Sequence, residues 1–250
     1  MRSNNKKTNE YEIKGKKRNK KDKKKHSKLK KVILIIFITL VIIGLTGIGI
    51  FAGIFFSDKW KITKEDVVIG YNNTTVYDSE GKFLCELSGD ENRKIISLAD
   101  MGKYIPKAFV AIEDERFEKH SGVDLKRTAG AIVNFIIHRG KSSYGGSTIT
   151  QQLVKNMMKE DEDEGLAGVR RKIREWSRAY QIEQMLSKNQ ILETYLNQVF
   201  MGGGTNIYGV EKASKYYFNK SASELTLAEA AFLAGINRAP NAYNPYEEGN

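Results

Sequence analysis

One long apolar run limits what this chain can be. Residues 32–56 are 25 consecutive residues without a charged side chain. A helix of that length can span the roughly 30 Å hydrocarbon core of a bilayer. A buried core helix is rarely apolar on every face for so long, and a cleaved signal peptide usually has a shorter apolar region. The run therefore predicts an uncleaved signal anchor that crosses the membrane once.

The positive charge of the chain lies before this run. Residues 1–31 contain 15 Lys and Arg against 3 Asp and Glu, a net charge of +12, whereas the remaining residues carry 26 against 27, a net charge of −1. The formal total of +11 therefore belongs to a tail, and we expect no nucleic-acid partner. A segment so rich in Lys and so poor in apolar residues predicts a disordered tail. The positive-inside rule predicts that the tail lies in the cytoplasm and everything after residue 56 outside the cell.

The pattern after the anchor predicts a connector and then one mainly helical domain. Residues 57–100 contain two short β-prone runs around a Gly-containing turn, which predict a hairpin. Residues 101–250 show apolar residues at helical spacing, and the second helix of this domain is expected to be a core helix. The predicted helices cover 106–116, 125–138, 170–186, 188–199, 209–218 and 225–236. The single cysteine, Cys85, excludes an intramolecular disulfide and a cysteine-based metal site.

Two segments carry candidate chemistry. Residues 113–124 place Glu113 and Asp114 at the end of an apolar segment. Residues 145–156 form a glycine-opened stretch, rich in hydroxyls and amides, that leads into a helix carrying Lys155. A general base beside an anion-binding surface is what glycosyl transfer from a phosphate leaving group requires.

A second acid, Glu175, lies much further along the chain among basic residues. Two carboxylates in different surroundings can divide the roles of a glycosyl reaction. An apolar-flanked Glu113 would handle protons, and Glu175 would stay ionised. Nearby cations can hold a pyrophosphate through charge-assisted hydrogen bonds, although charges on helices are more often ordinary surface charge. The cations in question are Lys155, Arg170, Arg171, Lys172 and Arg174.

Five motifs in order resemble the peptidoglycan glycosyltransferases, which are the glycosyltransferase domains of class A penicillin-binding proteins and of monofunctional murein polymerases. The motifs are EDERFEKHSGVD (113–124), GGSTITQQLVKN (145–156), RKIRE (171–175), ILETYLN (191–197) and LAEAAFLAGI (227–236). The resemblance extends over about residues 70–245. The family implies a mainly α, lysozyme-like fold with a large helical lobe and a small membrane-associated jaw, here preceded by one transmembrane helix.

The resemblance also implies a reaction and its partners. The substrate is lipid II, a disaccharide-pentapeptide on undecaprenyl pyrophosphate. The reaction adds it to a growing glycan strand through β-1,4 bonds, with inversion and release of the lipid pyrophosphate. Membrane lipid is a further expected partner, as are proteins of cell-wall synthesis or division. A divalent cation, Mg²⁺ or Mn²⁺, is an expected cofactor, and no organic cofactor is expected.

Residue roles follow from the resemblance by position. Glu113 would be the general base that takes the proton from the acceptor's 4-hydroxyl, and Asp114 would support it. Glu175 would orient the donor's pyrophosphate directly or through a divalent cation. The residues expected to bind substrate are the cations Lys155, Arg171 and Lys172, which would offset charge on the leaving group, and Ser147, Thr148, Gln151, Gln152 and Asn156, which would line the donor and acceptor sites.

Two positions depart from the family pattern. Tyr144 stands where a glutamine often precedes Gly-Gly-Ser-Thr, and Ala167 stands where an arginine is common, so that Arg170 is the candidate to replace it. No transpeptidase motifs follow, and the end at Asn250 is what a truncated copy of a class A protein would show. The residues leave two other functions open: a lysozyme-like lytic enzyme that cleaves glycan, and a truncated, inactive membrane-anchored scaffold.

Overall fold

The chain divides into two units, Met1–Ile54 and Phe55–Asn250. The computed structural model describes residues 4–67, 72–87, 89–138, 145–158, 165–202, 206–240 and 242–246. Tyr144, one of the two departures from the family pattern, lies outside these described residues.

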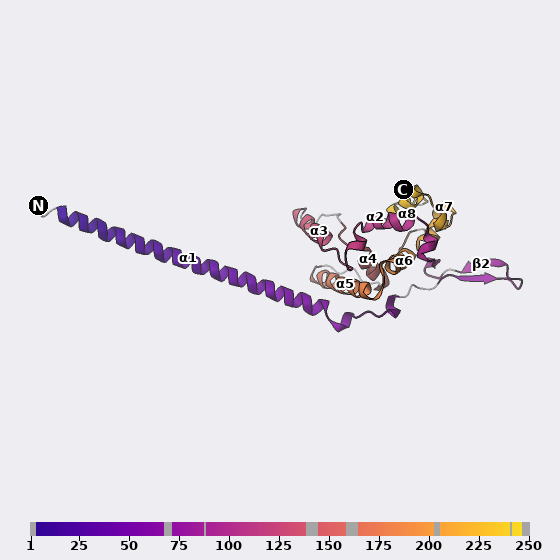
Figure 1. Cartoon of the computed structure of the whole chain (residues 1–250), viewed down its shortest axis with the longest axis horizontal. Coiled ribbons are helices and arrows are strands. Elements are labelled where there is room, and N and C mark those ends of the chain that lie inside the picture. The colour runs from indigo at the N-terminus through magenta and orange to yellow at the C-terminus, as the bar shows by residue number, and fades with distance from the viewer. Residues whose placement is uncertain are drawn as a thin grey trace. The chain divides into compact units, whose positions relative to one another are not determined.

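The first unit is a single helix, α1 (Asn4–Phe55), drawn in indigo to violet in Figure 1. Its segment Lys28–Phe55 is long and apolar enough to cross a membrane, and side chains such as Leu40 and Ile43 are exposed. The helix extends back to Asn4, and the disorder expected of the tail over residues 1–31 stays a prediction. Lys and Arg are good helix formers, and adding residues to an existing helix avoids the cost of nucleation.

The second unit begins with the connector. Two short 3₁₀ helices, η1 (Asp58–Trp60) and η2 (Glu65–Val67), come first. Strands β1 (Thr74–Tyr77) and β2 (Phe83–Leu87) then pair as an antiparallel hairpin where the sequence predicts one. The hairpin extends away from the helices in Figure 1. Its turn contains Gly81 at φ +80°, a conformation that favours glycine.

The remaining elements make this unit mainly helical, as predicted. Strand β3 (Asn92–Arg93) pairs in parallel with β4 (Ile207–Tyr208), which joins the connector to the C-terminal half. Helix α4 packs against α5 and α6, and α2 packs against α8. The helices are η3 (Leu98–Met101), α2 (Ile105–Glu113), η4 (Phe117–Lys119), α3 (Leu125–Ile137), α4 (Ile149–Met158), α5 (Gly165–Met185), α6 (Lys188–Gln198), α7 (Val210–Phe218), η5 (Ala222–Glu224) and α8 (Leu227–Ile236).

A shared core holds these helices together. Phe109 of α2 meets Tyr195 of α6 edge to face at 6.3 Å between ring centroids, and both rings are fully buried. Leu153 of α4, Ile182 of α5 and Leu233 of α8 are also fully buried. Burying each such side chain stabilises the fold by about 1.5–3 kcal/mol. The core therefore fixes the C-terminal end of α2 relative to α4 and α8, which is where the candidate base lies.

Helix α3 is not the core helix that its periodicity predicts. Leu125, Val133 and Ile137 are 75%, 55% and 67% exposed, and Ala129 is exposed as well. These four residues recur at steps of four, so they lie on one face of the helix. Helical spacing identifies an apolar face but does not say what covers it.

Glu211 of α7 is a buried carboxylate with a structural role. It is 2% exposed, and it accepts hydrogen bonds from the Ala222 N–H at 2.8 Å and the Ser221 hydroxyl at 3.3 Å. The Lys94 ammonium lies 3.1 Å away. Burial raises the pKa of Glu211, but these donors outweigh burial and hold the pKa below its ordinary value.

Glu211→Gln is expected to lower the free energy of unfolding by about 1–2 kcal/mol at pH 7, because the ionised acceptor of three donors is lost. The pKa of Glu211 is lower in the folded state than in the unfolded state. Its contribution to the free energy of unfolding is therefore complete above the unfolded-state pKa and is lost as the pH falls through the folded-state pKa. The difference between wild type and variant should therefore shrink below about pH 4. Thermal unfolding in detergent at pH 7 and at acidic pH measures this, with exposed Glu80→Gln as control. Equal melting temperatures of the wild type and Glu211→Gln at pH 7 would contradict the structural role of Glu211.

Candidate active site

Glu113 is the last residue of α2, and two amide side chains hold its carboxylate. Oε2 accepts a hydrogen bond from Gln152 Nε2 at 2.7 Å, and Oε1 accepts one from Asn237 Nδ2 at 2.9 Å. The expectation of an apolar flank is therefore wrong, because two polar donors face the carboxylate. Hydrogen bonds from neutral donors stabilise the anionic form. The half-buried Glu113 carboxylate is thus held in one orientation by two donors.

Tyr195 of α6 completes this network. Its hydroxyl donates to Gln152 Oε1 at 3.1 Å and accepts from Asn237 Nδ2 at 3.0 Å. Burial raises the pKa of Tyr195, and the nearby charge of Glu113 raises it further, so the hydroxyl stays protonated at neutral pH. A permanent donor on Gln152 Oε1 turns the amide NH₂ of Gln152 toward the base.

Asp114 joins the end of α2 to the start of α4. It is fully buried; one of its carboxylate oxygens accepts from the Ile149 N–H at 3.0 Å and lies 3.0 Å from His120 Nε2. These contacts place α4, and with it Gln152, relative to Glu113. The support that Asp114 gives to the base is therefore indirect.

Thr148 and Gln151 are buried in the fold and do not line an open surface. Thr148 caps α4, because its hydroxyl accepts from the Gln151 N–H at 3.2 Å, and it donates to the Gly122 carbonyl at 2.6 Å. Gln151 Nε2 donates to the same carbonyl at 3.3 Å. Gly122 has φ +87°, and a Cβ there would lie 2.6 Å from the Ala179 carbonyl of α5. The main chain at residue 122 therefore touches the main chain of α5.

A cationic pair surrounds the second acid. Glu175 of α5 is 5% exposed, with Lys172 Nζ at 2.6 Å from Oε1 and Arg171 Nη1 at 3.5 Å from Oε2. These pairs form because residues three and four apart share a helix face. Lys172 Nζ also lies 3.0 Å from Ser147 Oγ, just before α4.

Helix α4 connects the base to the cationic pair. Ser147, two residues before α4, contacts Lys172, and Gln152, the fourth residue of α4, contacts Glu113. Only five sequence positions therefore separate the residue that contacts the cation from the residue that contacts the base. Arg127 of α3 ties the same parts together, because it donates to the Gly145 carbonyl at 2.9 Å and to the main-chain carbonyl of Glu113.

The cations predicted as one cluster divide into two groups. Arg171 and Lys172 contact Glu175, whereas Arg170 and Arg174 lie over the Trp60 ring at 5.7 and 4.7 Å. Whether Arg170 replaces the arginine that the family often has at the position of Ala167 stays a prediction. Lys155 and Asn156 are exposed near the C-terminal end of α4.

A family model described as Transglycosylase matches residues 80–250, which include every residue of this site. The chain belongs to the transglycosylase family. Its membership agrees with the mainly helical fold. The two catalytic candidates of the transglycosylase, Glu113 and Glu175, lie in separate elements that α4 brings together.

Curated relatives of this transglycosylase are named penicillin-binding protein 1A. That of Clostridium acetobutylicum is 47% identical over 177 residues, which are 69% of this chain and 22% of the relative. That of Clostridium perfringens strain 13 is 37% identical over 248 residues, 96% of this chain and 35% of the relative. That of Neisseria lactamica is 43% identical over 171 residues, 68% of this chain and 20% of the relative. The chain thus spans only a fifth to a third of the length of these relatives. Together, these relatives and the apolar helix α1 indicate a membrane-anchored transglycosylase.

The surroundings of Glu175 do not suit the expected Mg²⁺ or Mn²⁺. Such ions need several oxygen ligands, but both oxygens of this carboxylate face cations, Lys172 and Arg171. Within the described part of the chain, no three His, Cys, Asp or Glu side chains group so that they could hold an ion. In this arrangement Lys172 and Arg171 supply the positive charge.

Sequence reasoning missed three residues of the transglycosylase site: Tyr195, Asn237 and Arg127. Tyr195 fits an inward helical stripe, so the pattern predicts only a core residue. A buried tyrosine hydroxyl needs a polar partner. That requirement could have indicated that Tyr195 makes a hydrogen bond within the domain. Asn237 directly follows α8, and no pattern links it to Glu113, which lies 124 residues away.

Proposed function

We propose that this transglycosylase polymerises lipid II into β-1,4-linked glycan strands, with inversion and release of undecaprenyl pyrophosphate. The proposal rests on one arrangement, an amide-held carboxylate at Glu113 connected by α4 to the Lys172–Glu175 pair. The growing glycan strand and the membrane would be its partners. Proteins of cell-wall synthesis or division are further proposed partners.

Glu113 would act at the nucleophile. Its carboxylate takes the proton of the acceptor's 4-hydroxyl while that oxygen forms a bond to the anomeric carbon of the donor. The bond from this carbon to the pyrophosphate oxygen breaks, and its electron pair leaves with the pyrophosphate. Attack from the opposite side inverts the anomeric centre. One base is enough for this reaction, because the leaving group needs charge stabilisation more than protonation.

Lys172 and Arg171 would act at the leaving group. Charge-assisted hydrogen bonds from these cations offset the negative charge that develops on the pyrophosphate. Glu175 keeps both cations oriented before substrate arrives, because it contacts each of them. Lys155 and Asn156, exposed further along α4, would extend the binding surface.

Parallel incubations test the proposal against the alternatives. The full-chain protein in detergent is given lipid II in one reaction and purified glycan strands in another. Polymer from lipid II, with no cleavage of the strands, is expected. Soluble fragments released from the strands would instead establish a lytic enzyme. Tight binding of a moenomycin-type phosphoglycolipid without either product would establish an inactive scaffold.

The apolar face of α3 supports a membrane-associated jaw. Leu125, Val133 and Ile137 are exposed on one helix face, and a lipid-borne substrate never leaves the bilayer surface. We infer that this face lies against the membrane, with the basic N-terminal segment in the cytoplasm and the transglycosylase domain outside.

The double variant L125N/V133N is expected to lower polymerisation of vesicle-embedded lipid II about tenfold, because apolar contact area with the bilayer is lost. Its melting temperature should change little, since both side chains are exposed. The conservative variant L125M/V133I should retain activity. Equal rates for L125N/V133N and wild type in vesicles would exclude the membrane contact.

Asn237→Ala is expected to lower kcat about tenfold with little change in KM, because Glu113 loses the donor on Oε1 and its orientation loosens. Steady-state polymerisation of lipid II measures both constants. Exposed Asn189→Ala is the matched control. An unchanged kcat in Asn237→Ala would remove this residue from the positioning of the base.

A further inference from the structure

Three arginines of α5 surround one tryptophan of the connector. The guanidinium carbons of Arg170, Arg174 and Arg178, here called the arginine stripe, lie 5.7, 4.7 and 5.8 Å from the centroid of the Trp60 ring. All three distances are within the range of cation–π attraction. The arginines recur at steps of four, so they share a face of α5. Arg171 and Glu175 follow two of them by one residue, which turns them about 100° around the helix axis.

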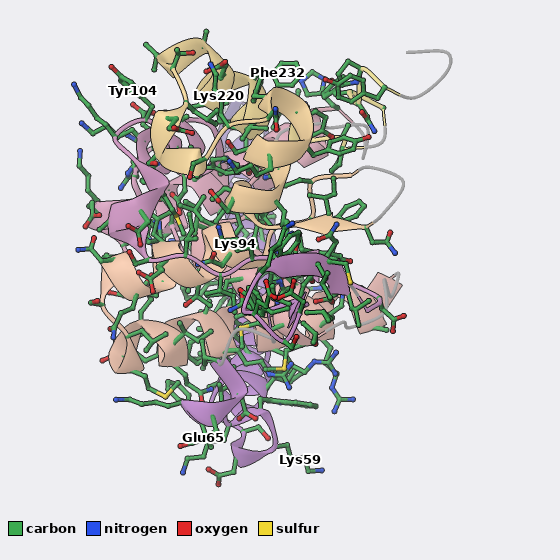
Figure 2. All side chains as sticks on the ribbon, turned by 90° about the vertical axis from the view of Figure 1, so that its right-hand side faces the viewer. Lys59, Glu65, Lys94, Tyr104, Lys220 and Phe232 are labelled. Carbon is green, nitrogen blue, oxygen red and sulfur yellow. The ribbon has the colours of Figure 1, made fainter. Side chains whose placement is uncertain are left out.

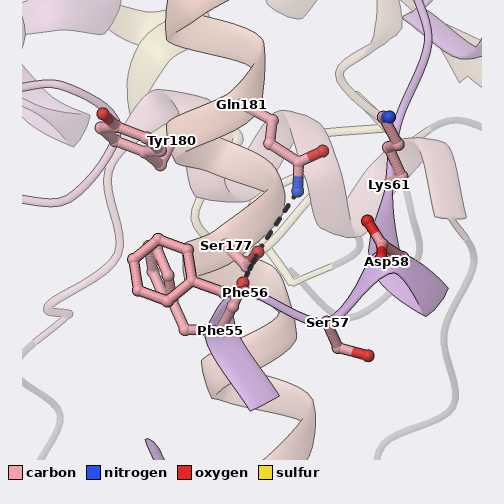
Figure 3. Close-up of a pocket in the computed structure, with 8 residues that line it drawn as sticks. All are labelled: Phe55, Phe56, Ser57, Asp58, Lys61, Ser177, Tyr180 and Gln181. Carbon is pink, nitrogen blue, oxygen red and sulfur yellow. Dashed lines mark hydrogen bonds between the residues drawn. The ribbon is translucent and has the colours of Figure 1, made fainter. Parts of the chain in front are cut away.

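Hydrogen bonds fasten the segment around Trp60 to α5. Gln181 Nε2 donates to the Trp60 carbonyl at 3.3 Å, and Gln181 Oε1 accepts from the Ile62 N–H at 3.1 Å. The Ser177 hydroxyl donates to the Phe55 carbonyl. Figure 3 shows Ser177 and Gln181 projecting from α5 toward this segment. The arginine stripe and Trp60 therefore belong to one fixed structure.

A cavity of about 190 Å³ opens at the same junction. Phe55, Phe56 and Tyr180 give it an apolar side, and Asp58 and Lys61 give it a polar side. A mixed lining of this kind suits a molecule with a charged head and an apolar body.

Chain length keeps Trp60 close to the end of the apolar segment. Trp60 lies only five residues after Phe55, the last residue of that segment, which is at most ~18 Å of extended chain. Figure 2 shows Lys59 and Glu65 at one end of the second unit, opposite Lys220 and Phe232. Tryptophan is enriched at membrane–water interfaces. This spacing allows Trp60 and the arginine stripe to reach lipid head groups.

The arginine stripe has the chemistry of a phosphate-binding surface. Arginines four residues apart on a helix repel one another, and arginine binds phosphate through paired N–H donors. Asp66 of the connector lies close enough to Arg178 for their charges to interact, so the stripe is partly offset by one acid.

We propose that Trp60 and the arginine stripe bind the phosphate of an anionic membrane phospholipid, with the adjoining cavity receiving the start of its apolar body. This site is separate from the Lys172–Glu175 pair. It does not depend on the proposed reaction, so a protein inactive toward lipid II can still bind phospholipid here.

Fluorescence of Trp60 tests the proposal directly. The chain has two tryptophans, so Trp176→Phe leaves Trp60 as the only reporter. The full-chain variant in neutral detergent is titrated with short-chain phosphatidylglycerol and with phosphatidylcholine. The fluorescence of Trp60 is expected to change saturably with phosphatidylglycerol. Phosphatidylcholine should bind at least tenfold more weakly, and added salt should weaken the binding of phosphatidylglycerol.

Substitutions then locate the site. R170Q/R174Q/R178Q should weaken phosphatidylglycerol binding at least tenfold, and R170K/R174K/R178K about threefold, because lysine lacks the paired donors. The control K103Q/K107Q/K215Q removes the same charge from exposed positions elsewhere and should bind as wild type does. Phospholipid phosphorus retained by the purified wild-type and stripe variants gives a second measurement if Trp176→Phe misfolds.

Three results would overturn the proposal. The first is equal response to phosphatidylglycerol and phosphatidylcholine. The second is undiminished binding by a folded R170Q/R174Q/R178Q variant. The third is an equal change in Trp60 emission with millimolar inorganic phosphate, which would assign the site to a soluble anion.

Discussion

Glu113→Gln is expected to lower glycan synthesis from lipid II about 10³-fold, because a neutral amide cannot take the proton of the attacking hydroxyl. The fold should survive, since the glutamine keeps the size of the side chain and its one carbonyl oxygen can still accept a hydrogen bond from either Gln152 or Asn237. Polymer formed per enzyme per minute, measured with labelled lipid II, gives the rate. Melting temperature and moenomycin-type ligand binding report the fold.

The neighbouring acid supplies a matched control. Glu115 is exposed, and Glu115→Gln makes the same chemical change two residues away. It should polymerise at nearly the wild-type rate. If Glu113→Gln retained more than about a tenth of the activity, the general-base assignment would fail, because a positioned base contributes at least about 10²-fold.

Lys172→Gln is expected to lower kcat about 10²-fold, because one preorganised cation no longer stabilises the leaving pyrophosphate. Arg171→Gln should have a smaller effect, since Arg171 lies 3.5 Å from Glu175 whereas Lys172 lies at 2.6 Å and also contacts Ser147. Steady-state kinetics with lipid II distinguish a loss of kcat from a rise in KM.

A buried carboxylate left with one cation can also destabilise α5, so stability must be separated from catalysis. The double variant K172Q/E175Q removes both partners and should regain thermal stability without regaining kcat. Exposed Lys107→Gln controls for loss of a positive charge. Recovery of kcat in the double variant would show that Lys172 acts only through the fold.

Periodicity predicted most of the helices because each of them has one face on the shared core. Helix α3 shows where that reasoning stops, since Leu125 and Val133 have the spacing of core residues and are exposed.

The site was predictable where a motif carries both partners and unpredictable where a contact is long-range. Lys172 and Glu175 belong to one motif, and their charged groups lie 2.6 Å apart. Asn237 could not be found, because its contact with Glu113 depends on how α8 packs against α2. The cation cluster divided because adjacent residues of a helix point about 100° apart, so proximity in sequence does not place two side chains at one site.

Gly122 has a consequence for the position of Glu113 relative to α5. Its φ of +87° and the contact that a Cβ would make with the Ala179 carbonyl leave room for a hydrogen atom and nothing larger. The segment that begins at Glu113 therefore contacts α5 through main-chain atoms at Gly122, and main-chain atoms have no alternative rotamers. Contact between main chains therefore limits how far Glu113 can move relative to the α5 residues Lys172 and Glu175.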